Sequence, residues 1–335
     1  MYIHLIGGAF MITVDTHSFD PYFNLAVEEY FLKNSTEDVF MLWQNNCTAV
    51  IGRNQNVYAE INIPYAKEKG ITVIRRITGG GAVYHDLGNV NYTFITSREK
   101  AGALNFAYFT APIISALAQY GITAELSGRN DILANGFKFS GNAQHSTDTR
   151  ILHHGTLLFD SDLTVMPSLL TVDPEKIKSK SIKSVRSRVT NLKPLFSKDI
   201  AVGEFMELIR AHVKDMYSTV HHEITADELQ EIMLIREKYA SPEWTFTPKG
   251  SYDNRSKKYF PFGLVDIYYS VRSAAIENIS ICGDFFGTKD TSLIENILKG
   301  VRHEERFIRE RLADTDIGDY ISGMNNDEFI NMLFE

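Results

Sequence analysis

Three consecutive glycines, Gly79–Gly81, follow two arginines, Arg75 and Arg76, and this run most constrains the fold. The apolar run Ile71–Ile74 precedes it and predicts a buried strand. Consecutive glycines allow backbone angles that other residues avoid, and they let a ligand lie directly on the backbone. We therefore expect them to serve ligand approach rather than packing. Guanidinium groups beside exposed N–H groups suit a phosphate or carboxylate, although a flexible turn with a solvated arginine pair is an open alternative.

The glycine run matches neither of two common phosphate-binding motifs. It lacks the Gly-Lys-Ser/Thr ending of a P-loop, and no Gly-x-Gly-x-x-Gly spacing opens a helix here. Its function therefore has to be decided by other parts of the chain.

Composition limits the classes of protein to which the chain can belong. A length of 335 residues favours two domains, and 44% hydrophobic with 12% aromatic residues argues against disorder. A formal charge of −8 disfavours a nucleic-acid partner. The two cysteines, Cys47 and Cys282, form no disulfide framework and no Cys-x-x-Cys site. The apolar start, residues 1–14, has no basic region and is too short to span a bilayer. We therefore expect a cytoplasmic protein with no membrane partner, in which residues 1–10 are an extension.

The hydrophobic pattern predicts an alternation of helices and strands. Helices are expected over Asn24–Lys33, Phe106–Tyr120, Val202–Tyr217 and Asp227–Tyr239. Strands are expected over Val39–Trp43, Thr48–Ile51, Val90–Phe94, Ile122–Leu126 and Ile151–Phe159. In Val90–Phe94 apolar residues alternate with Asn91 and Thr93, which predicts a half-buried strand.

The dipeptide Asn135-Gly136 predicts a hairpin with a type I′ turn. With a two-residue loop, alternation places one set of side chains on each face. One face then carries Asp131, Leu133, Lys138 and Ser140, and the other, which we expect in the core, carries Ile132, Phe137 and Phe139. Lys138 is thus mounted between two buried aromatic residues with Asp131 as a diagonal neighbour. A structural ion pair is one interpretation; the rigid mounting favours a functional lysine.

Two further stretches carry titratable side chains. His153 and His154 are adjacent, so they point to opposite faces of a strand and make a poor metal pair. The stretch 176–193 contains seven basic residues and no acidic one. Such a run is usually a solvated loop, but it can also order over a polyanion such as a triphosphate.

The C-terminal part reads as a separate unit. Residues 247–257 are polar and contain Pro248 and Gly250, so they predict a linker between a domain of residues 1–246 and one of residues 258–335. The second unit is expected to contain a hairpin followed by helices, and to act as a cover or docking module. The expected strands are Tyr259–Val271 and Ala275–Phe285, and the expected helices are Asp290–Leu298, His303–Leu312 and Asp327–Phe334.

Five ordered motifs carry a resemblance to a known family. They begin at Arg75 (Arg-Arg-x-Thr-Gly-Gly-Gly-Ala-Val-Tyr-His-Asp), Gly128 (Gly-Arg-Asn-Asp), Lys138 (Lys-Phe-Ser-Gly-Asn-Ala-Gln), His154 (His-Gly-Thr-Leu) and Ser184 (Ser-Val-Arg-Ser-Arg-Val-Thr-Asn-Leu). Over roughly residues 15 to 335 the chain resembles the lipoate–protein ligases. The resemblance implies an α+β catalytic domain related to biotin ligases and class II synthetases, with a mixed, largely antiparallel sheet and a small α+β accessory domain.

The resemblance also implies an activity. Such enzymes use ATP with Mg²⁺ to activate lipoate as lipoyl-AMP, releasing pyrophosphate. They then transfer the lipoyl group to one lysine of an apo-lipoyl domain, found in the E2 subunits of 2-oxoacid dehydrogenases and in the glycine-cleavage H protein. We expect a monomer that holds no metal through a protein site of its own.

Site residues follow from the motifs. Lys138 is implied as the catalytic lysine that contacts the lipoyl carbonyl and the α-phosphate, and we add Asp131 as a helper that takes a proton from the acceptor amine. The residues implied to bind lipoate or lipoyl-AMP are Arg75, Arg76, Thr78, Gly79, Gly80, Gly81, His154, Gly155 and Thr156. The residues implied to bind ATP are Arg76, Gly81, Ala82, Val83, Tyr84, Lys138, Lys183 and Arg186. Thr78 and Tyr84 stand where Ser and Phe are common alternatives in the family.

Other activities stay open at this point. An octanoyl- or lipoyl-transferase on the same fold needs no ATP and often uses a nucleophilic cysteine, but neither Cys47 nor Cys282 lies in the five motifs. A biotin ligase shares the mechanism but not these motifs. A non-catalytic lipoyl-binding protein would not need the full set of site residues. The sequence does not decide between lipoate, octanoate and a lipoyl peptide as donor.

Overall fold

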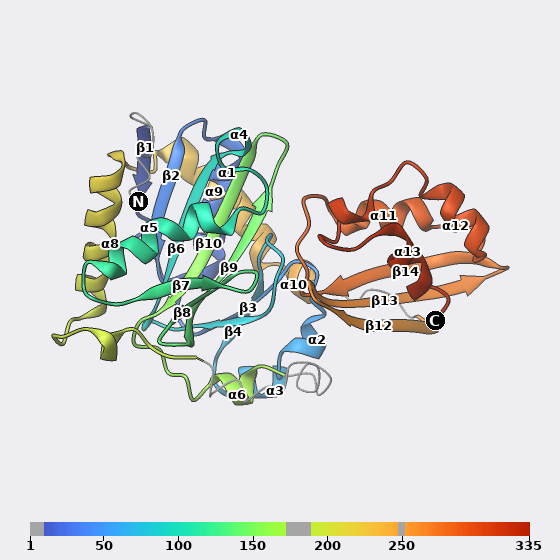
Figure 1. The fold of residues 1–335 in the computed structure, drawn as a ribbon, viewed down its shortest axis with the longest axis horizontal. Helices are drawn as coiled ribbons and strands as arrows, with labels where there is room; N and C mark the ends of the chain where they lie inside the picture. Colours follow the sequence, from blue (N-terminus) through green and yellow to red (C-terminus); the bar gives the residue numbers. More distant parts are fainter. Residues whose placement is uncertain (1–9, 172–188, 247–251) are drawn as a thin grey trace.

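An eight-stranded sheet forms the centre of the larger body (Figure 1). The computed structural model describes residues 10–171, 189–246 and 252–335. The strands are β1 Phe10–Val14, β2 Asp38–Trp43, β6 Asn89–Ser97, β7 Ala124–Ser127, β8 Asp131–Ala134, β9 Phe137–Ser146, β10 Arg150–Leu158 and β11 Ser218–His222. Their order is β11-β1-β2-β6-β10-β9-β8-β7. Strand β1 pairs in parallel with β11 and β2, and the other neighbours are antiparallel, which confirms the predicted mixed, largely antiparallel sheet.

Helices cover both faces of this sheet. They are α5 Phe106–Ala118 and α8 Val202–Met216 on one face, and α1 Pro21–Asn34 and α9 Ala226–Ala240 on the other. Strand β2 shows the result, because all six of its residues are buried. Phe40 and Leu42 pack with α5 and α8, whereas Val39, Met41 and Trp43 pack with α1 and α9. The two-residue period of a strand thus supplies two separate cores.

Strand β6 is buried on both faces, so the prediction of a half-buried strand is wrong. Asn91 is 2% exposed and Thr93 is fully buried. Helix α1 packs over that face, and Thr93 Oγ1 accepts a hydrogen bond of 2.9 Å from Nε1 of Trp43. The polar side chains therefore face a polar interior layer instead of water.

The hairpin of β8 and β9 confirms the predicted turn but corrects its register. Asn135 and Gly136 have φ of 52° and 79°, as a type I′ turn requires. A bulge between Ile132 and Leu133 then shifts the pairing, so Ile132 faces Ser140. Because of this shift the alternation predicted from the turn fails beyond the bulge, and Ser140 is fully buried.

Phe137 corrects the predicted core. Its side chain is 48% exposed, since it borders the turn at the end of the hairpin, whereas Phe139 and Ile132 are fully buried as expected. Lys138 is therefore flanked by one buried aromatic residue and one exposed one.

A second sheet of three strands, in the order β4-β3-β5, carries the glycine run. Its strands are β3 Thr48–Ile51, β4 Thr72–Arg75 and β5 Val83–His85, and the short helices beside it are α2 Val57–Glu60, α3 Ile63–Glu68 and α6 Met166–Leu169. The glycines connect β4 to β5, so both ends of the loop are held by the same central strand, β3.

The C-terminal unit is a three-stranded antiparallel sheet with helices packed on it (Figure 1). Its elements are β12 Asn254–Phe260, β13 Gly263–Arg272, β14 Ala275–Gly283, α11 Thr291–Leu298, α12 Glu305–Arg311 and α13 Asn326–Met332. The predicted strand Tyr259–Val271 is wrong, because a tight turn after Phe260 divides it. Strand β12 also includes residues 254–257, which were predicted as part of the linker. Their polar side chains are compatible with a strand because β12 lies at the edge of the sheet.

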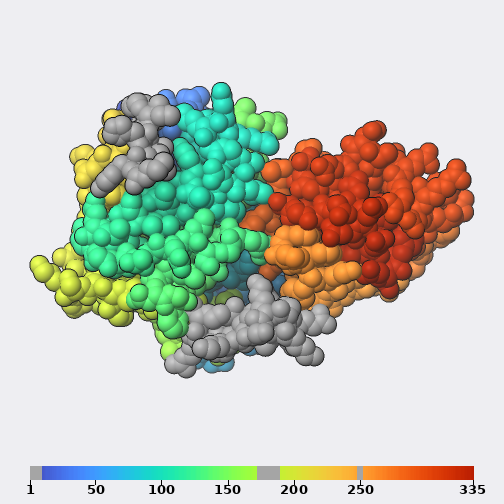
Figure 2. All heavy atoms as spheres, viewed as in Figure 1, coloured from blue at the N-terminus to red at the C-terminus, as the bar shows by residue number. Residues whose placement is uncertain are grey.

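The two bodies are in contact (Figure 2). Gly283 N donates to Asn54 O at 2.9 Å, and Arg53 forms an ion pair with Asp290. Phe286 packs against Phe106.

The remaining short elements are α4 Arg98–Ala101, α10 Pro242–Phe246, η2 Lys193–Leu195 and η3 Ile317–Asp319.

In the part of the chain that the structure describes, no helix combines the length and apolar character needed to cross a membrane.

Candidate active site

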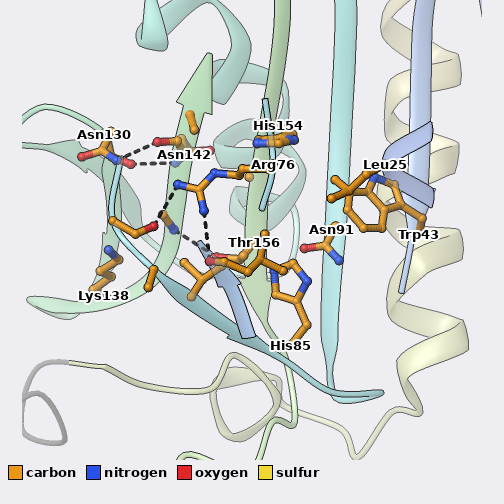
Figure 3. Close-up of a pocket in the computed structure, with 17 residues that line it drawn as sticks. Leu25, Trp43, Arg76, His85, Asn91, Asn130, Lys138, Asn142, His154 and Thr156 are labelled. Atoms are coloured by element: carbon orange, nitrogen blue, oxygen red, sulfur yellow. Dashed lines mark hydrogen bonds between the residues drawn. The ribbon is translucent and has the colours of Figure 1, made fainter. Parts of the chain in front are cut away.

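A cavity of about 90 Å³ lies between the glycine loop, helix α1 and strands β6, β9 and β10. Figure 3 shows Lys138 and Asn130 at one side of it and Leu25 and Trp43 at the opposite side. Among the described residues, the charged side chains that line it are Arg76 and Lys138, and no carboxylate does so. The cavity thus has a cationic end and an apolar end.

Lys138 stands at the cationic end on strand β9. Its Nζ lies 2.7 Å from Oδ1 of Asp131, and both side chains are about one-third exposed. Its stem lies over Gly141, where an added Cβ would come within 3.0 Å of Nζ. Thr190 N donates to the carbonyl oxygen of Lys138 at 2.9 Å, so β9 is held from both sides here. The ammonium is therefore fixed in direction and still open to the cavity.

Arg76 is buried and holds the glycine loop in shape. Its Nη2 donates to the carbonyl oxygens of Gly79 and Gly81 at 2.7 and 2.8 Å, and its Nε donates to Thr78 Oγ1 at 2.8 Å. Burial lowers the pKa of Arg76 to about 10, with Glu28 opposing that shift. The guanidinium therefore stays charged at neutral pH while it holds the loop in shape at the cavity wall.

A buried polar chain continues from Arg76 across the sheet. Thr78 Oγ1 lies 2.8 Å from Nε2 of His154, and Nδ1 of His154 lies 3.0 Å from Oε1 of Glu28, whose carboxyl group accepts. Thr93 also donates to Glu28. With both ring nitrogens bonded, His154 is held in one orientation at the cavity wall.

Arg75 does not reach the cavity. Its guanidinium donates to the carbonyl oxygens of five residues, which lie on both sides of it: Gly52, Arg53, Gln55, Trp244 and Thr245. Burial lowers the pKa of Arg75 to about 10. Its place in the structure is that of a cross-link between the loop after β3 and helix α10.

Two of the three glycines are packed, which corrects the expectation that the run serves ligand approach alone. A Cβ at Gly79 would lie 2.5 Å from Phe285 O, and one at Gly80 would lie 3.1 Å from the Phe286 ring. Gly80 N also donates to Phe285 O at 3.4 Å. Only Gly81 of the three has open space around the Cβ position.

Close packing on β9 and β10 explains another glycine. A Cβ at Gly155 would lie 2.1 Å from Oδ1 of Asn142 and 2.6 Å from the ring of Tyr92. Asn142 in turn exchanges hydrogen bonds with Asn130, whose Nδ2 donates to Asn142 O at 2.6 Å. Thr156 Oγ1 also accepts a hydrogen bond from Gly141 N at 3.1 Å. These contacts fix strands β9 and β10 against each other next to Lys138, at the cationic end of the cavity.

Comparisons with known proteins decide the family. Residues 20–214 match the family described as "Lipoyl protein ligase A/B catalytic domain", and residues 249–333 match "Bacterial lipoate protein ligase C-terminus". The chain belongs to the lipoate–protein ligase family. It is 39% identical to the lipoate-protein ligase LplJ of Bacillus subtilis over 331 residues, covering 97% of this chain and 100% of that one.

Solved structures of ligases share this fold. The chain resembles P. falciparum LipL1 in complex with lipoate, with a TM-score of 0.80, 25% identity and coverage of 98% of this chain and 100% of that one. It also resembles a lipoate-protein ligase A bound with ATP, with a TM-score of 0.60, 23% identity and coverage of 72% and 99%.

The ligase brings only some of the predicted site residues to the cavity. Those that line it are Arg76, Gly81, Ala82, Val83, Lys138, His154, Gly155 and Thr156. Those that do not are Arg75, Thr78, Gly79, Gly80, Tyr84 and Asp131. Tyr84 packs in the core beside β3, and burial raises the pKa of its hydroxyl. Lys183, Arg186 and most of the basic stretch lie outside the described residues.

Several site residues escaped the sequence analysis. Glu28 carried a signal, because it follows Leu25 by three residues and precedes Leu32 by four, within the apolar stripe of α1. His85, Asn130 and Asn142 stand in the quoted motifs but were not assigned to the site, and the others are Leu25, Trp43 and Asn91. Trp43 and Asn91 lie on predicted strands. The sequence pattern does not show, however, which face of these strands borders a cavity.

His153 and His154 point to opposite faces, as predicted. The ring of His153 stacks on that of Phe109, with 4.7 Å between the ring centroids, on the face of the sheet that α5 and α8 cover. His154 instead forms a hydrogen bond with Glu28 on the cavity side. Within residues 10–171, 189–246 and 252–335, no three His, Cys, Asp or Glu side chains are grouped to hold a metal ion.

Proposed function

We propose that this chain is an ATP-dependent lipoate–protein ligase that forms lipoyl-AMP and then lipoylates a lysine of an apo-lipoyl domain. One observation carries the proposal: a single cavity has Lys138 at one end and Leu25 with Trp43 at the other. Such a cavity suits an acid with a hydrophobic tail whose carboxylate must meet a phosphate. The family membership and the ATP-bound relative support the same reaction class.

In the first step, a carboxylate oxygen of lipoate attacks the α-phosphorus of ATP. A new C–O–P linkage forms, the bond to the β-phosphate breaks, and pyrophosphate leaves. Two negatively charged groups must approach each other, so a fixed cation between them lowers the barrier. The Lys138 ammonium fits this role, because Asp131 and Gly141 fix its direction before substrate arrives.

The glycine loop would support the phosphate. Arg76 Nη2 donates to the carbonyl oxygens of both Gly79 and Gly81, so a cation offsets the repulsion between these carbonyls and a phosphate. Since no side chain stands at Gly81, the phosphate can approach the backbone directly.

In the second step, the acceptor lysine amine attacks the carbonyl carbon of lipoyl-AMP. An amide bond forms, the mixed-anhydride C–O bond breaks, and AMP leaves. Lys138 would polarise the carbonyl, and Asp131, whose carboxylate lies 2.7 Å from Lys138 outside the cavity lining, would take the amine proton.

Mg²⁺ fits this site as the counter-ion of ATP. The donor set that lines the cavity has amides, hydroxyl and imidazole groups but no carboxylate among the described residues. Mg²⁺ prefers oxygen ligands and is often held mainly by substrate phosphates and water. Bound that way, it would neutralise charge on the triphosphate. Lys138 would bind the carboxylate of the acid, and Arg76 would hold the glycine loop.

The proposed acceptors are apo-lipoyl domains of 2-oxoacid dehydrogenase E2 subunits and the glycine-cleavage H protein. We propose that the ligase acts on them in the cytoplasm as a monomer.

The direct test is to incubate the full chain with ATP, Mg²⁺, lipoate and a purified apo-lipoyl domain, and to measure the mass of the acceptor. We expect one lipoyl group per domain, dependent on ATP, and pyrophosphate release from ATP and lipoate without acceptor. Equal lipoylation without ATP would contradict a ligase and favour a transferase.

A further inference from the structure

Two buried hydrogen-bond donors in the cavity wall have no partner among the described residues. His85 and Asn91 are 3% and 2% exposed, and both line the cavity. Nε2 of His85 and Nδ2 of Asn91 lack a hydrogen-bond acceptor in that part of the chain. In Figure 3 both side chains lie between Lys138 and the apolar end formed by Leu25 and Trp43. Buried donors without a protein partner are rare, and a bound water or a ligand atom is what satisfies them.

A chain of amides fixes which nitrogen of His85 carries the proton. Asn24 Nδ2 donates to the carbonyl oxygens of Ser18 and Gln44, so its orientation is set by backbone. Its two hydrogens are shared between these oxygens and Oδ1 of Asn45 at 2.9 Å, which leaves Asn45 Nδ2 to donate to Nδ1 of His85 at 3.1 Å. Nδ1 of His85 is therefore an acceptor, and Nε2 carries the hydrogen.

His85 is also a neutral donor. Burial, with Arg76 and His154 nearby, lowers the pKa of His85 to about 3. A neutral N–H group binds a neutral acceptor without attracting the carboxylate away from Lys138. Asn91 also offers a donor: its Oδ1 accepts from Asn89 Nδ2 at 3.0 Å, and its Nδ2 has no acceptor among the described residues.

We propose that His85 and Asn91 donate to the ring sulfur atoms of lipoate and select the dithiolane ring over a plain acyl chain. This inference rests on the proposed function and names the substrate class of the same site. Lipoate carries acceptors only in its carboxylate and its two sulfur atoms. The carboxylate is drawn to the ammonium of Lys138, so the sulfur atoms are the acceptors left for the remaining donors.

The physical basis is the cost of leaving a buried donor unsatisfied. An octanoyl chain, or any ring of carbon alone, would displace water from His85 Nε2 and Asn91 Nδ2 and offer no acceptor. Sulfur is a weak acceptor, so the expected preference for lipoate is modest, about tenfold in the dissociation constant.

The test compares lipoate with cyclopentyl-pentanoate, which has the same chain and ring size but no sulfur. Calorimetric titration of the full chain with each acid gives the ratio of their dissociation constants. We expect wild type to bind lipoate about tenfold more tightly, and His85→Phe or Asn91→Leu to reduce that ratio to about threefold or less. Thr110→Val is the matched control, because it removes a buried hydrogen bond, from Thr110 Oγ1 to Phe106 O at 3.0 Å, at a residue that does not line the cavity, and it should keep the wild-type ratio.

The outcomes are separable. Cyclopentyl-pentanoate that binds a variant at least as well as wild type shows that the variant is folded, and if His85→Phe fails to fold, Asn91→Leu decides. Equal affinity of wild type for both acids, equal weakening of both acids in His85→Phe and Asn91→Leu, or no binding of either acid would overturn the inference. A clear preference for lipoate without pyrophosphate release would instead contradict the proposed ligase while leaving the selection of the ring intact.

Discussion

A methyl group added at Gly79 would strike the C-terminal unit and leave the cavity untouched. The Cβ of Gly79→Ala would lie 2.5 Å from the carbonyl oxygen of Phe285, well inside van der Waals contact. The backbone at Gly79 is not in the left-handed region, so the contact is the only source of strain. Either the loop or the Phe285 backbone has to move, and the bond from Gly80 N to Phe285 O would be lost.

The magnitude follows from two terms. Forcing a methyl group into a packed site costs about 1–3 kcal/mol. The hydrogen bond from Gly80 is long, at 3.4 Å, so its loss adds little, about 0.5 kcal/mol. We expect the contact between loop and C-terminal unit to open more easily by about 1.5–3.5 kcal/mol, which corresponds to roughly tenfold to three-hundredfold.

Hydrogen exchange measures this opening residue by residue. The Gly80 amide should exchange about tenfold to three-hundredfold faster in Gly79→Ala than in wild type. Gly81→Ala is the matched control, because its Cβ meets no atom within 4 Å. It should leave exchange at Gly80 unchanged but slow pyrophosphate release, since its methyl group stands at the cavity. Equal exchange at Gly80 in both variants would refute the assignment of Gly79 to packing.

Three other predictions follow from the site and its burial. Lys138→Ala should lower pyrophosphate release by about a hundredfold or more with unchanged melting temperature, while Phe137→Ala, an exposed neighbour, should keep normal activity; near-normal release by Lys138→Ala would refute its role. The double variant Cys47→Ala with Cys282→Ala should keep ATP-dependent lipoylation, because neither thiol lines the cavity; a covalent acyl adduct in wild type that is absent from the double variant would contradict this. His85 is neutral in the folded state with a pKa of about 3, so the unfolded state binds one more proton below its ordinary pKa of about 6.5. The neutral, buried His85 therefore contributes fully to the free energy of unfolding above pH 6.5, and this contribution falls by about 1.4 kcal/mol per pH unit between pH 6.5 and 3. Denaturation curves should show that the free energy of unfolding of His85→Phe falls less steeply with decreasing pH than that of wild type. Equal slopes in the two proteins would contradict this prediction.

Local conformational rules were readable from the sequence because they act within a few residues. Asn135-Gly136 specifies its turn through two residues that tolerate positive φ. Helix α9, predicted over Asp227–Tyr239, begins at a capping box that is legible in the sequence, in which Thr225 and Glu228 bond each other's backbone. The five motifs, read together, also indicated the family, which the matches to the two family descriptions confirm.

Tertiary structure alone decided which polar side chains meet the cavity. Arg75 and Arg76 are adjacent and chemically identical, yet Arg75 is enclosed by carbonyl oxygens of α10 and the loop after β3, while Arg76 faces the site. Asn91 reads as solvent-facing by alternation, yet α1 covers that face of β6 and makes Asn91 part of the wall. Periodicity states which residues share a face, but it does not state what packs on that face. That depends on elements far away in the chain, and their approach determines whether a polar group meets water, another protein group or a ligand.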